Sequence, residues 1–534
     1  MRVLIVGGVA GGATAATRIR RNCEDCEIVI FERSNYVSYA NCGMPYYIGD
    51  EITNKNALTL QTPKSLWDRY RIDVKVRHEV LDIDKDNKTI TVLNLNDNTT
   101  TKEAYDKLLL SPGVKPINLP FLKGMNNVFT LRTVEDTFKI KEYINLEKPR
   151  NVAIIGGGFI GVEMAENLSN LGLEVTIIEK GKHLLGIVDS DIASIIHHHI
   201  RSNGVKILLE TDASKIDLNY DMILESVGVK PDNSLAVKAG LDLGVNGSIK
   251  VNDKMETSVK DIYAVGDAVE ITNLLLNKKQ VITLAGPANK EARVAADNIC
   301  GIENTYKGSI ASSVIKVFDM TVAATGITEE EAKKNNIKYD KVILSPANHA
   351  TYYPGAAIMT LKVIFEKESQ KILGAQAVGY DGVDKRIDVI ATAIFAELKA
   401  TDLKDLDLCY APPYSSAKDP VNMAGFIIDN IANGVVKQFY YDDINDLRKK
   451  EDVILIDTRT SNEYSMGYAA GFINIPLDEL RERLNELEKN KKIYVMCHSG
   501  MRSYLATRIL VNNGFDAYNF VGGYKLYSSI FNDK

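Results

Sequence analysis

The chain has 534 residues, several times the length of a typical domain of about 150 residues, so three or four domains are expected. A net charge of −6 gives no basic surface of the kind that binds nucleic acid. No run of about 18 apolar residues is present, so we expect no membrane span. Six cysteines in a chain of this length do not form a disulfide framework and are expected to be thiols in the cytoplasm.

The amino-terminal residues predict the strand–loop–helix–strand unit of a dinucleotide-binding fold. An apolar strand over 2–6 precedes a helical stretch that reaches about Arg21, and a second strand over 27–31 ends on Glu32. The loop between strand and helix contains Gly7, Gly8, Gly11 and Gly12. Its spacing departs from G-x-G-x-x-G because Val9 occupies the middle glycine position.

The same unit recurs with full glycine spacing at 151–179. We expect strands over 151–155 and 174–178 and a helix over 162–171. The loop glycines are Gly156, Gly158 and Gly161. Glu179 ends the second strand, where a carboxylate hydrogen-bonds a ribose 2′-hydroxyl and repels a 2′-phosphate. The unit therefore favours NADH, with NADPH possible, and two copies of it are poorly explained by ordinary turns.

Further along the chain, two more strands run into turns. A strand over 105–110 leads into the turn 111–113, and a strand over 261–265 leads into a Gly-Asp pair. From about 320 to 435 the pattern changes to strands with few glycine loops, which predicts a third domain. A new α/β pattern begins near residue 437, after a linker expected at about 432–439.

The paired loops, the Ser111-Pro112-Gly113 turn and the segment 264–267 together resemble the pyridine nucleotide-disulfide oxidoreductase family. The resemblance extends from residue 1 to about 435. It implies that the first loop binds FAD, that the second binds NADH and that Asp267 contacts the ribityl chain of the flavin. The residues that it places around the two cofactors are Gly7, Gly8, Gly11, Gly12, Glu32, Arg33, Val80, Ser111, Gly113, Gly156, Gly158, Gly161, Glu179, Gly266 and Asp267.

Cys42 is a solitary redox thiol. Relatives that reduce disulfides carry two cysteines spaced C-x4-C, but the second position here is Tyr47, so an internal dithiol cycle is excluded. A single thiolate beside a flavin can form a mixed disulfide or persulfide, or it can cycle through sulfenic acid. An inert buried cysteine is the alternative, which the neighbouring Gly43 and Pro45 disfavour.

The context of this cysteine resembles coenzyme A-disulfide reductases and their persulfide-reducing relatives. The matching segments are Asn41-Cys42, Pro45-Tyr46, 349–355 and 410–414. The resemblance implies a homodimer in which Tyr353, or its neighbour Tyr352, and Tyr410 approach Cys42 from the partner subunit. A phenol hydroxyl there can donate a hydrogen bond to the thiolate.

Coenzyme A carries phosphates, so cations and hydroxyls should surround its site. The resemblance places Thr14, Arg18, Arg21, Ser38, Asn41 and Lys418 there. A solvated basic edge is the alternative for the two arginines, which share one helix face. Two departures weaken the assignment: Tyr70 and Asn289 stand where the family carries a lysine and a histidine.

The carboxy-terminal residues resemble a rhodanese domain. Asp457 and Arg459 follow a strand over 453–456, and a second strand over 492–496 leads into a loop from Cys497 to Arg502. Such a loop between strand and helix forms an anion nest, and the helix end and Arg502 would stabilise a thiolate that accepts and transfers sulfane sulfur. The C-x4-R spacing, one residue shorter than that of related phosphatases, favours sulfur over phosphate, and an inactive fold used for protein contacts is the alternative.

Two other patterns are not assigned a function. The pair Cys23 and Cys26 has no second pair with which to bind zinc, so we interpret it as a surface turn. The triplet 197–199 of histidines lies within a helix and cannot offer three ligands on one face. No metal site is therefore expected.

These features predict an α/β chain with two Rossmann-like dinucleotide-binding domains, an α+β dimerisation domain and a C-terminal α/β rhodanese domain. The expected bounds are 1–112 and 240–320 for a discontinuous FAD domain, 113–239 for the NAD domain, 321–435 for dimerisation and 440–534 for rhodanese. The expected function is NADH-dependent reduction of CoA disulfide, persulfide or polysulfide through Cys42, coupled to sulfur transfer at Cys497. The alternatives are an NADH oxidase or peroxidase, and a sulfur-trafficking or redox-sensing scaffold.

Overall fold

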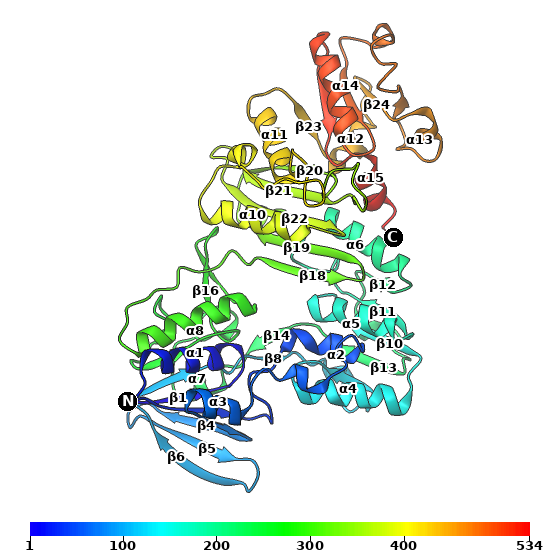
Figure 1. Ribbon diagram of the computed structural model, residues 1–534. Helices are drawn as coiled ribbons and strands as arrows, with labels where there is room; N and C mark the ends of the chain where they lie inside the picture. Colours follow the sequence, from blue (N-terminus) through cyan, green and yellow to red (C-terminus); the bar gives the residue numbers. More distant parts are fainter. Residues whose placement is uncertain (534) are drawn as a thin grey trace. The chain divides into compact units, whose positions relative to one another are not determined.

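The structure is a computed structural model and describes residues 1–533 (Figure 1). The chain divides into two compact units. The first comprises Met1–Gly181 and Gly204–Ala311, and the second comprises Lys182–Asn203 and the residues from Ser312 onward. No helix within the described range is long and apolar enough to cross a bilayer.

The first unit contains two parallel five-stranded sheets, each built around one of the repeated glycine-loop units. The first sheet has the order β15-β7-β1-β2-β3. Its strands are β1 (Arg2–Val6), β2 (Glu27–Glu32), β3 (Ile72–Val76), β7 (Lys107–Leu110) and β15 (Ile262–Ala264). Because β15 pairs in parallel with β7, residues from two distant segments of the chain complete one sheet. Helix α1 (Ala10–Asn22) packs against α8 (Ala285–Ile299), and both lie beside this sheet.

The second sheet has the order β12-β11-β10-β13-β9. Its strands are β9 (Val128–Thr130), β10 (Asn151–Ile155), β11 (Glu174–Ile178), β12 (Lys206–Leu208) and β13 (Met222–Glu225). Helix α5 (Phe159–Asn170) starts at the loop glycines and packs on β10 and β11. The expected repeat is thus confirmed, since both glycine loops join a central strand to a helix at the carboxyl edge of a parallel sheet. A three-stranded antiparallel sheet of β4 (His78–Asp84), β5 (Thr89–Asn94) and β6 (Thr99–Ala104) completes the unit's main strands.

The second unit contains one antiparallel and one parallel sheet. The antiparallel sheet has the order β18-β19-β22-β21-β20. Its strands are β18 (Ser313–Val317), β19 (Met320–Gly326), β20 (Tyr339–Leu344), β21 (Thr360–Glu366) and β22 (Ile372–Gly379), with α10 (Val383–Phe395) packed on β19 and β22. The last residues form a parallel sheet of order β23-β27-β26-β24-β25. Its strands are β23 (Lys437–Phe439), β24 (Val453–Asp457), β25 (Ile473–Asn474), β26 (Lys492–Met496) and β27 (Ala517–Phe520).

Two sequence-based expectations are wrong. Lys437–Phe439 lies within the expected linker, but it forms the edge strand β23 of the last sheet, because its backbone pairs with β27 and Phe439 packs on Phe520. The linker is therefore confined to the residues between α11 (Pro420–Ala432) and β23. Cys23 and Cys26 were expected to be thiols of a surface turn, but they form a disulfide that closes the turn after α1, with Cys26 buried in the core.

Helix α6 (Ser190–Ser202) connects the units in sequence but packs in the second. It contacts α15 (Gly523–Phe531) of the last domain. His197 is buried and its Nε2 accepts a hydrogen bond from the amide of Leu184, so its Nδ1 carries the proton that faces Asp533 at 2.6 Å. Arg201 pairs with the same carboxylate. Within the triplet, His197 thus has a packing and hydrogen-bonding role, whereas His198 is exposed.

Candidate functional site

The two glycine loops have the same construction. A Cβ at Gly12 would lie 1.9 Å from the carbonyl oxygen of Gly7, and a Cβ at Gly161 would lie 2.0 Å from that of Gly156, so only glycine allows the helix to approach the strand. Gly7 and Gly156 both have positive φ, at +91° and +107°. Gly158, by contrast, faces open space, which leaves room for a ligand at the helix start.

Each loop is also braced by the glutamate that ends the following strand. Glu32 accepts hydrogen bonds from the amides of Gly8 and Ser34, each at 2.9 Å. Glu179 accepts them from Gly157 at 2.7 Å and Gly181 at 2.6 Å. The repeated sequence therefore produces a repeated hydrogen-bond pattern.

The residues expected around the first dinucleotide come together at one cavity. Its lining includes Gly7, Gly11, Glu32, Arg33, Val80, Ser111, Gly113, Gly266 and Asp267. Gly8 and Gly12 do not line it, because Gly8 packs on Val37 and Gly12 on Gly7. Asp267 is half-buried, and desolvation raises the pKa of its carboxyl despite the opposing charge of Arg132.

The second loop opens on a separate cavity lined by Gly156, Gly158 and Glu179. Gly161 does not line this cavity and instead lies where α5 packs on the strand end. Lys180 borders the same cavity beside Glu179. The two loops therefore border two distinct cavities within one compact unit, as two dinucleotide sites would require.

Cys42 lies in a 3₁₀ turn (Asn41–Gly43) that leads directly into α2 (Met44–Ile48). Its side chain is exposed. Partial desolvation, followed by the negative charges of Glu163 and Asp267, raises the pKa of the Cys42 thiol. This chain's own groups near the sulfur thus disfavour the thiolate that its proposed chemistry needs, so donors or positive charge from elsewhere must stabilise it.

Glu163 is a functional candidate that sequence reasoning missed. It projects from α5, and burial raises the pKa of its carboxyl to about 7. The hydroxyl of Tyr46, in α2 just after Cys42, donates to its Oε1 at 3.5 Å. Its position four residues into a helix gives no signal in the sequence, because the packing of α2 on α5 brings it towards Cys42.

The tyrosines expected near the thiol lie in the second unit. The hydroxyls of Tyr352 and Tyr410 are 2.9 Å apart, whereas Tyr353 packs edge-on against His349. Their hydrogen bond raises the pKa of Tyr352. The geometry thus pairs Tyr410 with Tyr352, the neighbour of the residue that the sequence favoured, and both side chains are open to solvent.

The residues expected to bind coenzyme A are distributed over both units. In the first unit, Thr14 donates to Asn289 at 2.7 Å, and Arg18 is bonded through its Nε to Asp297 at 2.7 Å, while Arg21 is exposed. Ser38 and Asn41 are half-buried, and the side-chain oxygen of Asn41 is buried with no hydrogen-bond partner. Lys418 is exposed in the second unit.

The loop that follows β26 encloses Cys497. This cysteine is buried, and its sulfur accepts hydrogen bonds from the amide of Gly500 at 3.1 Å and the hydroxyl of Ser503 at 3.3 Å. Gly500 has φ +103°, which turns its amide towards the sulfur before α14 (Met501–Asn512) begins. The neighbouring strand β24 ends on Asp457, so both functional segments meet at the carboxyl edge of one parallel sheet.

Both arginines of this loop region are bonded to carboxylates. The two terminal nitrogens of Arg502 each donate to Glu463 at 2.7 Å, and this pairing lowers the pKa of Glu463 to about 2. Arg459 is buried, donates to Asp457 at 2.7 Å and lies 3.8 Å from the ring centre of Tyr524. Arg502 was expected to stabilise the Cys497 thiolate. In the structure its guanidinium is hydrogen-bonded to the carboxylate of Glu463.

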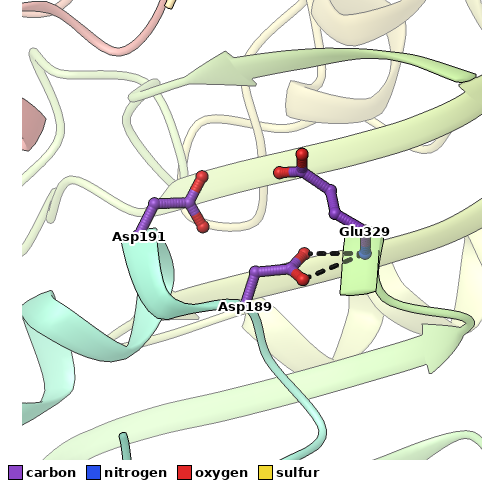
Figure 2. A group of neighbouring side chains, drawn as sticks. All are labelled: Asp189, Asp191 and Glu329. Carbon is purple, nitrogen blue, oxygen red and sulfur yellow. Dashed lines mark hydrogen bonds between the residues drawn. The ribbon is translucent and has the colours of Figure 1, made fainter. Parts of the chain in front are cut away.

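Three buried carboxylates in the second unit have the spacing of a metal site (Figure 2). They are Asp189, Asp191 and Glu329, and Asp189 accepts hydrogen bonds from the amide of Glu329. The ammonium of Lys362 occupies their centre, bonded to Asp189 at 3.0 Å and to Asp191 at 2.8 Å, and it also pairs with Glu329. Burial opposes its charge, but the three carboxylates raise the pKa of Lys362. A lysine thus fills the position that a cation would take.

Three comparisons with known proteins match this geometry. Residues 1–292 match the pyridine nucleotide-disulphide oxidoreductase model, 312–420 its dimerisation domain and 441–530 the rhodanese-like domain. The coenzyme A disulfide reductase of Staphylococcus haemolyticus is 38% identical over 437 residues, which are 80% of this chain and 98% of that protein.

Two similar solved structures extend over the last domain as well. The reduced CoADR-RHD of Bacillus anthracis is 46% identical with a TM-score of 0.97, covering 100% of this chain and 98% of that one. The NAD-dependent persulfide reductase of A. fulgidus is 35% identical with a TM-score of 0.92, covering 99% and 100%. The expected fold class is confirmed, and the chain is an oxidoreductase that belongs to the pyridine nucleotide-disulphide oxidoreductase family and carries a carboxy-terminal rhodanese-like domain.

Proposed function

We propose that this protein is an NADH-dependent flavoprotein that reduces sulfur–sulfur bonds of small molecules through Cys42 and exchanges sulfane sulfur through Cys497. The observation that carries the proposal is that one chain combines a solitary exposed thiol, two cavities at its glycine loops, the first of them lined by the neighbouring Asn41, and a loop that donates two hydrogen bonds to the Cys497 sulfur. The similar proteins named for coenzyme A disulfide and persulfide reduction support this substrate class.

The first cavity fits FAD. Its half-buried Asp267 carboxyl receives no hydrogen bond from the described residues, and a ribityl hydroxyl would supply one. The amide groups at the start of α1 would face the pyrophosphate. When bound, FAD supplies two-electron transfer between a nicotinamide and sulfur. The second cavity, with Glu179 at its edge, fits the ribose of NADH.

The protein's own contribution to catalysis is nucleophilic and electrostatic. The Cys42 thiolate attacks one sulfur of CoA disulfide, the substrate S–S bond breaks, and one CoA thiolate leaves as a mixed disulfide forms on Cys42. The leaving thiolate takes a proton, and Glu163, whose pKa lies at about 7, can supply one near neutral pH through Tyr46. With a persulfide, the Cys42 thiolate attacks the outer sulfur, the S–S bond breaks, the parent thiolate leaves and a persulfide forms on Cys42. With polysulfide the same attack expels a polysulfide chain shortened by the transferred sulfur.

We further propose a homodimer in which the Tyr352–Tyr410 pair of one subunit serves Cys42 of its partner. The match to a dimerisation domain and the exposure of both hydroxyls support this arrangement. The pairing of β7 with β15 supports a discontinuous FAD domain, and β18 supports a start of the dimerisation domain near Ser312. The other domain bounds stay predictions. A cytoplasmic location and the coenzyme A contacts of Thr14, Arg18, Arg21, Ser38, Asn41 and Lys418 stay predictions.

The test is steady-state NADH consumption with CoA disulfide, CoA persulfide and polysulfide, each compared with oxygen uptake. We expect turnover on at least one sulfur substrate, abolished by Cys42→Ser. Tight coupling of NADH to oxygen with no sulfur turnover would instead establish an oxidase. Negligible rates with every acceptor would favour a scaffold.

A further inference from the structure

Among the charged side chains near Cys497, Lys525 has no carboxylate partner within residues 1–533. Arg502 is committed to Glu463 through two hydrogen bonds, and Arg459 is committed to Asp457. Both arginines thus share their charge with a carboxylate, and Arg502 also interacts electrostatically with Cys497. A site that takes sulfur from an anionic donor still needs a counter-charge.

Lys525 has the position to supply that charge. It lies in the first turn of α15, where its amide donates to the carbonyl of His498 at 3.0 Å, while the amide of Tyr524 donates to the carbonyl of Cys497 at 2.7 Å. The start of α15 is therefore bonded directly to the sulfur loop. The charge of Lys525 acts on His498, which belongs to that loop.

Without a bound anion, the charged form of the Lys525 ammonium is disfavoured. The side chain is half-buried, and no carboxylate among residues 1–533 is paired with it. Burial alone lowers its pKa, with no compensating partner. Its charge acts on the neighbouring His498, whose pKa burial lowers and which Glu463, Arg459 and Arg502 also influence. An incoming anion would relieve this unpaired charge.

We propose that Lys525 binds the anionic oxygen group carried by the sulfane-sulfur donor of Cys497. The group is the sulfonate of thiosulfate or a carboxylate or phosphate of a persulfidated small thiol. The inference rests on the proposed sulfur-transfer function of Cys497. With thiosulfate, the Cys497 thiolate attacks the outer sulfur, the donor S–S bond breaks, and sulfite leaves with its electron pair as the Cys497 persulfide forms.

The test is sulfur transfer to cyanide from two donors, thiosulfate and glutathione persulfide, in the full-length holoenzyme. Lys525→Met removes the charge and keeps the apolar stem. Since a hydrogen bond to a charged group is involved, we expect KM to rise about 10-fold or more for the donor that Lys525 binds, with kcat changed far less. The donor that responds identifies the source of the anionic group, and Lys525→Arg should restore most of the loss.

The matched control is Lys489→Met. Lys489 is an exposed lysine of the same domain, before the start of β26 and hence at the opposite end of that strand from Cys497, and its substitution should leave both KM values unchanged. A second measurement needs no turnover: sulfite should protect Cys497 from alkylation, followed on its peptide by mass spectrometry, at lower concentration in wild type than in Lys525→Met.

The outcomes separate the two proposals. If wild type transfers sulfur through Cys497 but Lys525→Met changes neither KM nor sulfite protection, the role of Lys525 is wrong and the proposed function stands. If wild type transfers no sulfur from either donor and Cys497→Ser behaves as wild type, the proposed role of Cys497 fails, and the inference with it.

Discussion

The hydroxyl groups of Tyr352 and Tyr410 lie 2.9 Å apart although 58 residues separate them in sequence. One can donate to the other while the second keeps its proton for an external acceptor, so the pair can deliver a directed hydrogen bond to a thiolate. Tyr353 makes no such bond among the hydrogen bonds of the described chain and instead packs on His349.

Removing either hydroxyl of this pair should impair reduction at Cys42. We expect Tyr352→Phe and Tyr410→Phe each to lower kcat with CoA disulfide about 10- to 100-fold, because thiolate stabilisation is lost. The double variant should be little worse than either single one, since the hydroxyls act as a unit. Tyr414→Phe, at a tyrosine that is 72% exposed, serves as the control. A larger effect from Tyr353→Phe would contradict the pairing.

The charge of Glu163 should control the reactivity of Cys42. The carboxyl has a pKa of about 7, so it is mostly ionised above that pH, where its negative charge raises the pKa of Cys42. Glu163→Gln removes the charge and should lower the Cys42 pKa, so that alkylation by iodoacetamide reaches half its maximum rate at lower pH.

The difference between the two proteins should be largest above pH 7 and vanish below it, where wild-type Glu163 is protonated. Glu142→Gln, at an exposed position, provides the control. An unchanged or raised Cys42 pKa in Glu163→Gln would contradict the prediction that the charge of Glu163 raises the pKa of Cys42.

The buried cluster around Lys362 should be structural. Among the described residues, Lys362→Met leaves the three buried carboxylates with Lys341 as their one cationic partner. We therefore expect the free energy of unfolding to fall by about 3–5 kcal/mol, measured as a lower thermal unfolding temperature. As a control, Lys338→Met breaks an exposed ion pair with Glu368 and should change the free energy of unfolding by less than about 1 kcal/mol. Because an ammonium fills the centre, ethylenediaminetetraacetate should have no effect on the unfolding temperature, and a chelator-dependent shift would refute this assignment.

Glu179 should set the preference for NADH. Its carboxylate is fixed at the second glycine loop by the amides of Gly157 and Gly181. Glu179→Ala removes both the acceptor for the ribose hydroxyl and the repulsion of a 2′-phosphate. We therefore expect kcat/KM for NADH to fall about 10-fold and the ratio of kcat/KM for NADPH to that for NADH to rise. Glu174→Gln, at the exposed start of the same strand, should leave the ratio unchanged. Equal losses with both nucleotides would point to a structural role instead.

Local patterns in the sequence were sufficient for the elements whose form depends on near neighbours. The strand expected at 492–496 is β26, residue for residue, and both glycine loops join a strand to a helix as expected, the first despite Val9 at its middle position. The reason is that a tight strand-to-helix turn and a carboxylate at the next strand end impose their requirements within about 30 residues. The solitary Cys42 and the loop at Cys497 are visible for the same reason.

Only the tertiary structure decided which distant groups meet. It joined Lys437–Phe439 to the last sheet and brought Tyr352 rather than Tyr353 to Tyr410. It also placed Lys362 among carboxylates from α6 and α9 (Glu329–Lys334). These contacts depend on side-chain direction and on the approach of elements far apart in sequence, where one residue's shift turns a side chain to another face, and no local pattern encodes that choice.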